Sequence, residues 1–468
     1  MAKESGEGMY ERITALLKNE SCRFTPSGPT IGEIAARSAG FRDLLRRQVV
    51  PADEPVCLCC EDRSLLLAAL LASLAGAPPF IVPHAFNRQV LTEAREARPF
   101  RLILADTAVE PPEGTEVISW EACPIGPPSL PLVHPLDQPF LWLFTGGSTG
   151  RPRLWAKTPK NLFQEAFHLA ETFAVGPDDL ILSTVGPRHI YGLLGSVLLP
   201  FVSQAKILNR TYAFPREILA ALHRHEATIL LSVPPHYRAF RTAAPVRGTL
   251  RLALSSAAPL APEDGAFFLE QTGLAIHELY GSTETGGMAL RAYGADHGAW
   301  EPFTCLEWKI AEERLCVRSP FVSPDLPRDD EGFFMTADRC AAAGARRFQV
   351  LGRIDAVVKI AGKRVDLEEV RERIRRIPGV SDACLLTLPR ADARQVEICA
   401  LIAGAGPARE IRAAVRVLAD PYGRPRRVRI VKALPLLPNG KIDRKKIEGL
   451  FAAPPPRPRA EESPAGVI

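Results

Sequence analysis

The sequence predicts an α/β protein: a large N-terminal domain of two doubly wound α/β subdomains plus a small β subdomain, followed by an α+β C-terminal domain. Short apolar strands alternate with amphipathic helices from Val56 to Tyr280, which indicates parallel sheets covered by helices on both faces. From Ala299 to Arg347, short strands follow one another without helices, which predicts the small β subdomain. Beyond Gly352, strands and helices mix over about 100 residues, the size of a separate domain.

The first half of the chain supplies most of the predicted elements. Each strand is a short β-branched or leucine-rich run, and each helix has apolar residues at helical spacing. The expected strands are 56–60, 80–82, 102–105, 141–144, 153–158, 180–185, 206–208, 228–233, 250–255 and 275–280, and the expected helices follow residue 62 and span 88–97, 160–173, 191–202, 216–227 and 262–272.

In the second half of the chain the order of predicted strands and helices changes, and this change indicates the domain boundaries. The expected elements are strands 306–310 and 314–317, hairpin 357–365, helix 366–377, strands 383–388, 396–403 and 428–431, and helix 408–418. At 468 residues, about two to four domains are usual. We expect an N-terminal domain over residues 1–352, a C-terminal domain over 353–451 and a disordered, proline-rich tail over 452–468.

The composition predicts a soluble globular protein, with 46% hydrophobic and 24% charged residues. The arginines behind the net charge of +5 are widely spread, so an anionic small molecule suits the chain better than a nucleic acid. The longest apolar helix, 65–77, is too short for a bilayer core of about 30 Å, and the charged N-terminus does not resemble a signal peptide. The ten cysteines form no paired Cys-x-x-Cys clusters with histidine, which favours buried thiols over zinc sites or disulfides and predicts a cytoplasmic location.

One stretch, Thr145 to Gly150, has the composition of neither core nor ordinary loop. Its side chains are all small, it lies between two predicted strands, and Pro152 prevents a helix from starting there. Glycines let backbone N–H groups converge on an anion, and hydroxyls add donors, so the loop predicts a site for phosphate oxygens beside Arg153. The spacing fits neither a Walker A motif nor Gly-x-Gly-x-x-Gly. A plain hairpin turn explains the loop, taken alone, equally well.

A second stretch, from Glu278 to Gly287, lies at the carboxyl end of a predicted strand, where open α/β sheets bind ligands. Tyr280 can stack on a purine, Thr283 can bond a phosphate, and Glu284 can hold Mg²⁺ on a nucleotide. Taken alone, a loop with a capping Ser or Thr and a solvated Glu is the commoner interpretation.

Two further stretches carry isolated charged residues. Asp338, in Thr-Ala-Asp, and Arg353, in Gly-Arg-Ile-Asp, are suited to hold a vicinal diol, one as acceptor and one as donor. Lys441 follows Gly440 in a turn, where a long cation can reach a neighbouring cleft. Each of these residues, taken singly, is more often a surface ion-pair partner or a solvated charge.

The order and spacing of the four stretches resemble the adenylate-forming superfamily, which contains AMP-forming acyl-CoA and aryl-CoA synthetases, peptide-synthetase adenylation domains and beetle luciferases. Five motifs of the family are matched in order. The phosphate loop is matched at 145–153, Tyr-Gly-x-Thr-Glu at 280–284, Thr-Gly-Asp at 336–338, Gly-Arg-x-Asp with Val-Lys-Ile-x-Gly-x-Arg-Val at 352–365, and Gly-Lys-Ile-x-Arg at 440–444. The chain departs from this pattern at Gly146, Arg153 and Ala337, where the family has Ser, Lys and Gly.

The resemblance implies two half-reactions. A carboxylic acid attacks the α-phosphorus of ATP to give an acyl adenylate and pyrophosphate, and the thiol of CoA, or of a carrier-protein phosphopantetheine, then displaces AMP. It also implies a C-terminal domain that swings between the two steps, with Asp355 as the hinge. ATP, Mg²⁺ and CoA or phosphopantetheine are therefore the expected cofactors, and a carboxylic acid and CoA or an acyl carrier protein are the expected partners.

The resemblance also assigns roles to individual residues. The expected catalytic residues are Lys441, Glu284, Thr283 and Arg153, and the expected Mg²⁺ ligands are Thr149 and Glu284. The expected cofactor-binding residues are Thr145, Gly146, Gly147, Ser148, Thr149, Gly150, Ser256, Ala257, Ala258, Tyr280, Gly281, Asp338, Arg353, Lys359 and Gly362. His189, Tyr191 and Gly192 match the segment at the mouth of the acyl pocket, although one turn of a core-facing helix explains them equally well.

Three interpretations follow. The leading one is a ligase that makes acyl-CoA or aryl-CoA. A close alternative is an adenylation enzyme that loads a carrier protein, and a different class is a non-catalytic nucleotide-binding homologue, suggested by Gly146, Arg153 and Ala337. The residues leave open which carboxylic acid is used, which acceptor takes it, the oligomeric state, and whether the three departures weaken activity.

Overall fold

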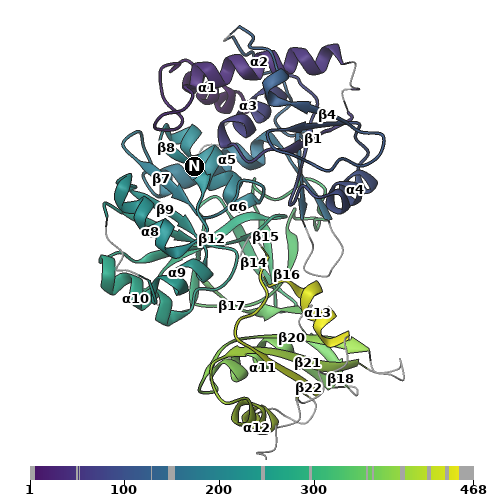
Figure 1. Cartoon of the computed structure of the whole chain (residues 1–468), viewed down its shortest axis with the longest axis vertical. Helices are drawn as coiled ribbons and strands as arrows, with labels where there is room; N and C mark the ends of the chain where they lie inside the picture. The colour runs from purple at the N-terminus through teal and green to yellow at the C-terminus, as the bar shows by residue number, and fades with distance from the viewer. Residues whose placement is uncertain are drawn as a thin grey trace, which may run out of the picture. The chain divides into compact units, whose positions relative to one another are not determined.

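The computed structural model describes residues 6–452, apart from 49–50, 52, 128, 146–152, 244–247, 295–297, 355–356, 361–362, 390–395, 419–422 and 438–441. The chain divides into two compact units, an N-terminal unit, Met1–Leu351, and a C-terminal unit, Gly352–Ile468 (Figure 1). The expected disordered tail, 452–468, lies outside the described residues apart from Ala452, which ends a helix, and the expected hinge, Asp355, also lies outside them.

The first sheet of the N-terminal unit has six strands in the order β4-β3-β1-β2-β5-β6. These are β1 (Val56–Cys59), β2 (Phe80–Pro83), β3 (Leu102–Ala105), β4 (Glu116–Ser119), β5 (Leu141–Thr145) and β6 (Arg153–Lys157). Neighbouring strands are parallel except that β6 pairs antiparallel with β5. The strands alternate between two apolar cores: Leu58 faces one, and Cys57 and Cys59 face the other.

The helices around this sheet are α1 (Gly6–Leu17), α2 (Ile31–Arg47), α3 (Arg63–Leu74) and α4 (Arg88–Ala97). Of these, α1 and α2 were not predicted from the sequence. A capping box starts α2: Thr30 accepts from the Glu33 N–H, and Glu33 accepts from the Thr30 N–H. Asp62 caps α3 by accepting from the Ser64 and Leu65 N–H groups.

The second sheet has eleven strands in the order β14-β15-β16-β17-β13-β12-β11-β10-β9-β7-β8. They are β7 (Leu180–Ser183), β8 (Lys206–Thr211), β9 (Ile229–Ser232), β10 (Leu252–Ser255), β11 (Ile276–Ser282), β12 (Gly286–Ala292), β13 (Ala299–Pro302), β14 (Glu307–Ala311), β15 (Arg314–Arg318), β16 (Phe334–Ala342) and β17 (Phe348–Arg353). Strands β7 to β11 are parallel, while β12 and β13 join antiparallel. The expected small β subdomain is therefore a continuation of this sheet.

Helices pack on both faces of the parallel part of this sheet. They are α5 (Pro159–Thr172), α6 (Ile190–Leu193), α7 (Leu199–Ser203), α8 (Pro215–Arg224), α9 (Pro234–Phe240) and α10 (Pro262–Thr272). Helices α8, α9 and α10 gather on one side (Figure 1), where Ile218, Phe240 and Phe268 share a core with Leu230 of β9. The neighbouring Leu231 belongs to the core of the opposite face, because successive strand residues point to opposite sides.

The expected helix over 191–202 is present as one continuous helical run, with a π-helical stretch in its middle. A five-residue π-helical stretch, Leu194–Leu198, separates α6 from α7, and Gln204 ends α7 in the left-handed region with φ +58°. Leu193, Leu194, Leu198 and Leu199 keep right-handed helical φ and ψ, so the chain stays helical across both joins. Pro200 lacks the N–H donor that a helix interior uses, and the π-helical stretch lies directly before it.

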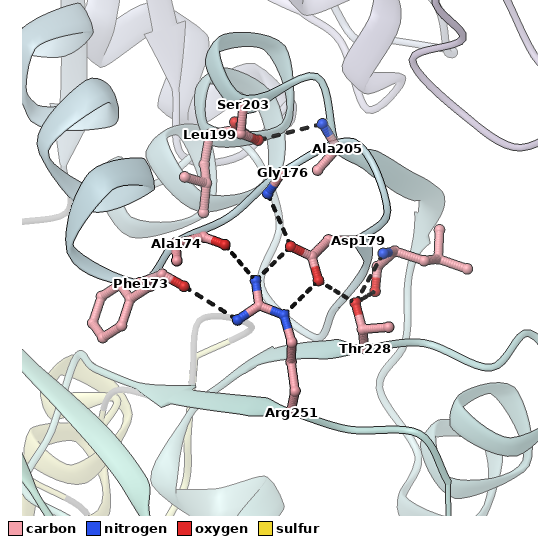
Figure 2. A network of polar contacts seen from close by, with 10 residues as sticks. Phe173, Ala174, Gly176, Asp179, Leu199, Ser203, Ala205, Thr228 and Arg251 are labelled. Carbon is pink, nitrogen blue, oxygen red and sulfur yellow. Dashed lines mark hydrogen bonds and ion pairs between the residues drawn. The ribbon is translucent and has the colours of Figure 1, made fainter.

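A polar network ties together the amino ends of strands β7, β9 and β10 (Figure 2). Arg251 forms an ion pair with Asp179 and donates to the carbonyl oxygens of Phe173 and Ala174. Asp179 also accepts from the Gly176 N–H at 2.9 Å and the Thr228 hydroxyl at 2.8 Å. This network fixes the end of α5 and three strands at the edge opposite the one where ligands are expected.

The C-terminal unit is an α+β structure with its own core. Its elements are β18 (Val357–Ile360), β19 (Lys363–Asp366), α11 (Leu367–Arg375), β20 (Val380–Pro389), β21 (Val396–Gly404), α12 (Ala408–Leu418), β22 (Arg427–Val431) and α13 (Arg444–Ala452). Strands β18 and β19 form the expected hairpin, and β20, β21 and β22 form a three-stranded sheet. Helix α12 has the predicted bounds and packs Ile411 and Val415 against the unit's core.

Candidate active site

The expected ligand-binding residues of the N-terminal unit follow the carboxyl ends of parallel strands. Ser256 follows β10, and Tyr280 lies near the end of β11, the next strand in the sheet. Parallel strands end at the same edge, so the segments 256–258 and 280–284 meet there. This edge, with the side chains that approach it, is the candidate active site.

Tyr280 and Asp338, which are 58 residues apart, are in direct contact. The Tyr280 hydroxyl donates to Oδ2 of Asp338 at 2.6 Å. The Tyr280 ring packs against Trp300, with centroids 5.0 Å apart, and meets the ring of Phe348 edge-on at 6.0 Å. The structure therefore brings together the residue expected to stack on a base and the residue expected to hold a diol.

The segment expected to line an adenine site is held against β11. The Ser256 hydroxyl donates to the Leu279 carbonyl oxygen at 2.8 Å. The buried Glu278 accepts from the Leu260 N–H at 2.9 Å and from Arg291 Nε at 2.6 Å, which fixes the end of the same loop. Ala257 is exposed and has φ +75°, a conformation that costs energy for a residue with a side chain.

The residues Ser282 to Gly287 form a tight turn between β11 and β12, named here the acidic turn. The hydroxyls of Ser282 and Thr285 lie 2.8 Å apart, and each accepts from the other residue's N–H at 3.2 Å. Gly286 has φ +67°, and a Cβ there would meet a Glu165 oxygen at 2.6 Å. Thr283 and Glu284 are half-buried at the tip of this turn.

Gly281, expected beside the adenine, has a structural requirement of its own. The register of β11 with β12 shifts between Tyr280 and Gly281. A Cβ on Gly281 would lie 2.3 Å from the Gly286 carbonyl oxygen, so only glycine allows this approach. The glycine at position 281 therefore allows β11 and β12 to approach each other closely at the base of the acidic turn.

Two charged residues that the sequence analysis missed lie buried behind the acidic turn. Lys157, the last residue of β6, is 0% exposed and donates to the Phe321 carbonyl oxygen at 3.3 Å. Glu165 of α5 is 3% exposed and accepts from the Gly287 N–H at 2.7 Å. The only sequence signal for Glu165 is a carboxylate on the apolar stripe that carries Leu162, Ala166 and Leu169.

Burial dominates the titration of both residues. It lowers the pKa of Lys157, although the carboxylates of Glu165, Glu284 and Asp325 act in the opposite direction. It raises the pKa of Glu165, which the Lys157 charge and the Gly287 N–H offset only in part. The region behind the acidic turn is thus a low-dielectric environment that holds charge.

The strands that flank the expected phosphate loop form an antiparallel hairpin. Thr145 ends β5 directly opposite Arg153, the first residue of β6. The Trp155 indole donates to the Thr145 hydroxyl at 3.3 Å, and Arg153 is exposed. The loop residues Gly146, Gly147, Ser148, Thr149 and Gly150 lie outside the described residues.

The expected acyl segment starts helix α6. His189 is the N-cap residue, and a Cβ on Gly192 would lie 2.0 Å from the Gly186 carbonyl oxygen. Tyr191 is half-buried, and burial raises the pKa of its hydroxyl well above the usual value. Arg188 forms an ion pair with Glu61 at 3.2 Å.

A hydrogen-bonded chain that the sequence analysis missed lies at the carboxyl ends of β7 and β9. His236 Nδ1 lies 2.8 Å from the Thr184 hydroxyl, which lies 2.9 Å from the Ser232 hydroxyl. These polar residues are scattered in the sequence, so no local pattern marks them.

The remaining expected residues belong to the C-terminal unit. Arg353 is half-buried, and Lys359 lies on β18. Gly362 and Lys441 lie outside the described residues, as does Asp355. Within the described part of the chain, no cluster of three or more His, Cys, Asp or Glu side chains is arranged to hold a metal ion. No described helix combines the length and apolarity needed to cross a bilayer.

Comparison with known proteins identifies the family. The model of the AMP-binding enzyme family matches residues 24–323. A 4-coumarate–CoA ligase of Rhodobacter capsulatus is 31% identical over 304 residues, which is 64% of this chain and 73% of the relative. A sulfoacetate–CoA ligase of Cupriavidus necator is 24% identical over 411 residues, 79% of each chain.

Solved structures share the fold. ATP-bound MatB from Rhodopseudomonas palustris superposes with a TM-score of 0.79 at 19% identity, over 94% of this chain and 98% of that one. A benzoate–CoA ligase from Burkholderia xenovorans gives 0.77 at 19% identity, over 93% and 99%. The chain therefore belongs to the AMP-binding enzymes of the adenylate-forming superfamily, whose members among its relatives are CoA ligases and peptide-synthetase adenylation domains.

Proposed function

We propose that the protein is an AMP-forming acid–thiol ligase that activates a carboxylic acid with ATP and transfers the acyl group to the thiol of CoA. The observation that carries this proposal is the contact of Tyr280 with Asp338 beside the acidic turn. The CoA ligases among the relatives support it. The mildly basic chain, with a net charge of +5, suits anionic substrates. We place the reaction in the cytoplasm.

In the first half-reaction, a carboxylate oxygen forms a bond to the α-phosphorus of ATP, and the bond to the β-phosphate oxygen breaks to release pyrophosphate. In the second, the sulfur of the thiol bonds to the acyl carbon, AMP leaves, and the thiol proton passes to solvent. The first step moves one anion toward a polyanion. Catalysis therefore consists mainly of positioning and of neutralising charge.

The nucleoside end of ATP is assigned to Tyr280 and Asp338, with Ser256, Ala257, Ala258 and Gly281 around the base. A carboxylate has about four lone-pair positions, so Asp338 can accept the Tyr280 hydroxyl and still accept a ribose hydroxyl. The Tyr280 hydrogen bond fixes the carboxylate before the nucleotide arrives, which reduces the ordering cost of binding. Arg353 is the proposed second partner of the ribose.

The phosphate end is assigned to the loop Thr145 to Gly150, with Thr283 and Arg153 as further donors. Glu284 fits Mg²⁺, because this ion is usually held by one or two carboxylates together with substrate phosphates. Bound Mg²⁺, with Thr149 as a second ligand, would neutralise phosphate charge. Lys441 is the proposed ammonium group that stabilises charge in the adenylation step.

The C-terminal domain, residues 353–451, is proposed to swing about Asp355 between the half-reactions, with Lys359 and Gly362 beside the pantetheine arm and residues 452–468 as a disordered tail. The acyl pocket is proposed to open at His189, Tyr191 and Gly192. A second candidate acceptor is a carrier protein, because relatives named pseudomonine synthase and dimodular nonribosomal peptide synthase match the chain.

The test is ATP-dependent pyrophosphate release from the purified full chain over a panel of aliphatic and aromatic acids. Each acid is offered with free CoA and, separately, with a phosphopantetheinylated carrier protein. Release that depends on one acid class, with a thioester formed on CoA, is the expected result. Thioester on the carrier alone selects the second candidate, and nucleotide binding without pyrophosphate release for any acid selects a non-catalytic homologue.

A further inference from the structure

Lys157 and Glu165 approach the acidic turn from two different elements. Glu165 bonds to the turn itself, and Lys157 bonds to a neighbouring segment. Glu165, on α5, accepts from the Gly287 N–H at 2.7 Å, at the end of the turn. Lys157, on β6, donates to the Phe321 carbonyl oxygen at 3.3 Å. The Ser323 N–H of the same segment donates to the Glu284 carbonyl oxygen at 2.8 Å. The tip of the turn, at Glu284, is thus bonded to the segment that Lys157 holds, and the end of the turn, at Gly287, is bonded to Glu165 itself.

The segment 320–323 is itself fixed from α5. Asn161 donates from its side-chain amide to the Pro320 oxygen at 2.6 Å and to the Val322 oxygen at 3.2 Å. Asn161 also completes a capping box with Thr158 at the start of the helix. The backbone of Glu284 is therefore connected through Ser323 to a segment that Lys157 and α5 hold together.

Strand β6 gives Lys157 a second connection. Its first residue, Arg153, is the last residue of the stretch 145–153 that matches the family's phosphate loop, and its last residue is Lys157. A strand rises by about 3.3 Å per residue, so one stiff element of about 13 Å joins the loop to the residue behind the acidic turn. Lys157 thus links the two segments assigned to the phosphate end of ATP.

Stability alone does not account for two buried charges at this place. Neither is exposed to water by more than 3%, and burying charge is costly unless excellent pairing offsets it. Apolar side chains of the same volume would fill the space without that cost. Lys157 also lies in the field of three carboxylates, those of Glu165, Glu284 and Asp325. The geometric link from Lys157 to Glu284 is the segment that contains Phe321, which accepts from Lys157, and Ser323, which donates to the Glu284 carbonyl oxygen.

We propose that Lys157 and Glu165 are positioning residues of the adenylation step, which fix Thr283 and Glu284 relative to the strand that leaves the phosphate loop. This inference rests on the proposed function. A misplacement of about 1 Å in an active site can lower a rate about 100-fold. The contact of Tyr280 with Asp338 does not involve either residue. Loss of the two charges therefore lowers kcat, while nucleotide binding is retained.

The test variant is Lys157→Met with Glu165→Gln in the same chain. Removing both charges avoids the unpaired buried charge that either single substitution leaves, and the glutamine oxygen still accepts from the Gly287 N–H. The matched control is Lys160→Met with Glu171→Gln, the same chemical change at partly exposed positions of α5. The readout is acid-dependent pyrophosphate release, with an acid that the wild-type protein accepts.

We expect kcat of the test variant to fall 10- to 100-fold, with KM for ATP and for the acid within threefold of wild type and a thermal midpoint within a few degrees. We expect the control to keep wild-type kcat. Unchanged kcat in a folded test variant overturns the proposal, and so does a loss that appears only in KM. If the double variant does not fold, Glu165→Gln is compared with Glu171→Gln by hydrogen exchange of amides 282–287, because the glutamine keeps the acceptor for the Gly287 N–H, and equal exchange in the two variants then overturns the proposal.

Hydrogen exchange supplies a readout that does not depend on turnover. We expect amides 282–287 of the test variant to exchange at least tenfold faster than in wild type, with unchanged exchange in α8. Equal exchange in both proteins overturns the positioning role. A wild-type protein that is inactive with every acid contradicts the proposed function instead, and exchange then decides the role of the two charges separately.

Discussion

Both ends of the parallel strands in the second sheet lie beside a buried carboxylate and a basic side chain, but these side chains interact differently at the two ends. At the amino ends, Asp179 and Arg251 form a direct ion pair. Near the carboxyl end of β11, Glu165 instead accepts from the Gly287 N–H of the acidic turn, and Lys157 of β6 donates to the Phe321 carbonyl oxygen behind it. The Arg251 side chain is 40% exposed, whereas Lys157 is 0% exposed.

The pKa shifts record this difference. Burial raises the pKa of Asp179, but hydrogen bonds from Arg251, Gly176 and Thr228 outweigh it and leave the pKa below its ordinary value. Burial raises the pKa of Glu165 and is only partly offset. A charge that is fully hydrogen-bonded contributes to stability, whereas a charge held without full compensation is a cost that a functional site can explain.

The largest expected effect concerns Lys441, the charge proposed for the reaction itself. Loss of one well-placed donor to a developing charge costs about 2.7–4 kcal/mol, or about 10²–10³ in rate. Lys441→Ala should reduce acid-dependent ATP–pyrophosphate exchange by that factor, with an unchanged thermal midpoint. Exchange that survives within a few-fold of wild type would show that Lys441 is not the charge-stabilising group.

The next effect should appear in stability rather than rate. Asp179→Asn removes the negative charge that pairs with Arg251 and weakens the bonds from Gly176 and Thr228. Hydrogen bonds to charged groups contribute about 1.5–3 kcal/mol, so the variant should lose about that much unfolding free energy. Its kcat at low temperature should equal that of wild type. A fall in kcat without a fall in the thermal midpoint would mean that the network at the amino ends of the strands serves catalysis and not stability.

The same comparison has a pH dependence. Because the folded-state pKa of Asp179 lies below its ordinary value of about 3.9, its stabilising contribution is present above about pH 4 and is lost as the pH falls through the folded-state pKa. The difference in thermal midpoint between wild type and Asp179→Asn should therefore be largest near neutral pH and shrink below about pH 4. A difference that is constant from pH 7 to pH 3 would mean that the carboxylate charge is not what stabilises the network.

The smallest expected effect concerns the contact that carries the proposed function. Tyr280→Phe keeps the ring against Trp300 and removes the hydroxyl that holds Asp338. Because the hydroxyl is proposed to act on the nucleotide only by orienting Asp338, we expect a loss of about 0.5–1.5 kcal/mol in binding, which is a rise of about 2- to 10-fold in Kd for ATP. Isothermal titration with ATP checks this directly, and an unchanged affinity would contradict the preorganising role of the hydroxyl.

Much of the fold follows from local sequence patterns. Helices α10 and α12 have the predicted bounds, because each has an apolar stripe and clear end signals, such as Gly273 in the left-handed region after α10. The antiparallel strands β12 and β13 were missed as a continuation of the second sheet, because pairing between distant strands leaves no local signal. The π-helical stretch between α6 and α7 was missed for a similar reason, since its geometry depends on packing around Pro200.

The candidate site divides in the same way. Tyr280 and Asp338 were predicted as parts of one site, because each lies in a short motif of the resembled family, and the structure brings them into contact. Lys157 and Glu165 lie in segments that look like an exposed strand end and an ordinary amphipathic helix. Their importance depends on the acidic turn, which packs against them from more than a hundred residues away.

The decisive experiment is a crystal structure of the protein with bound ATP. We expect the adenine against Tyr280, the ribose at Asp338, and the triphosphate between the loop at Thr145 to Gly150 and the acidic turn. Nucleotide bound at any other place, with Tyr280 still donating to Asp338 and no ligand beside Glu284, would contradict it.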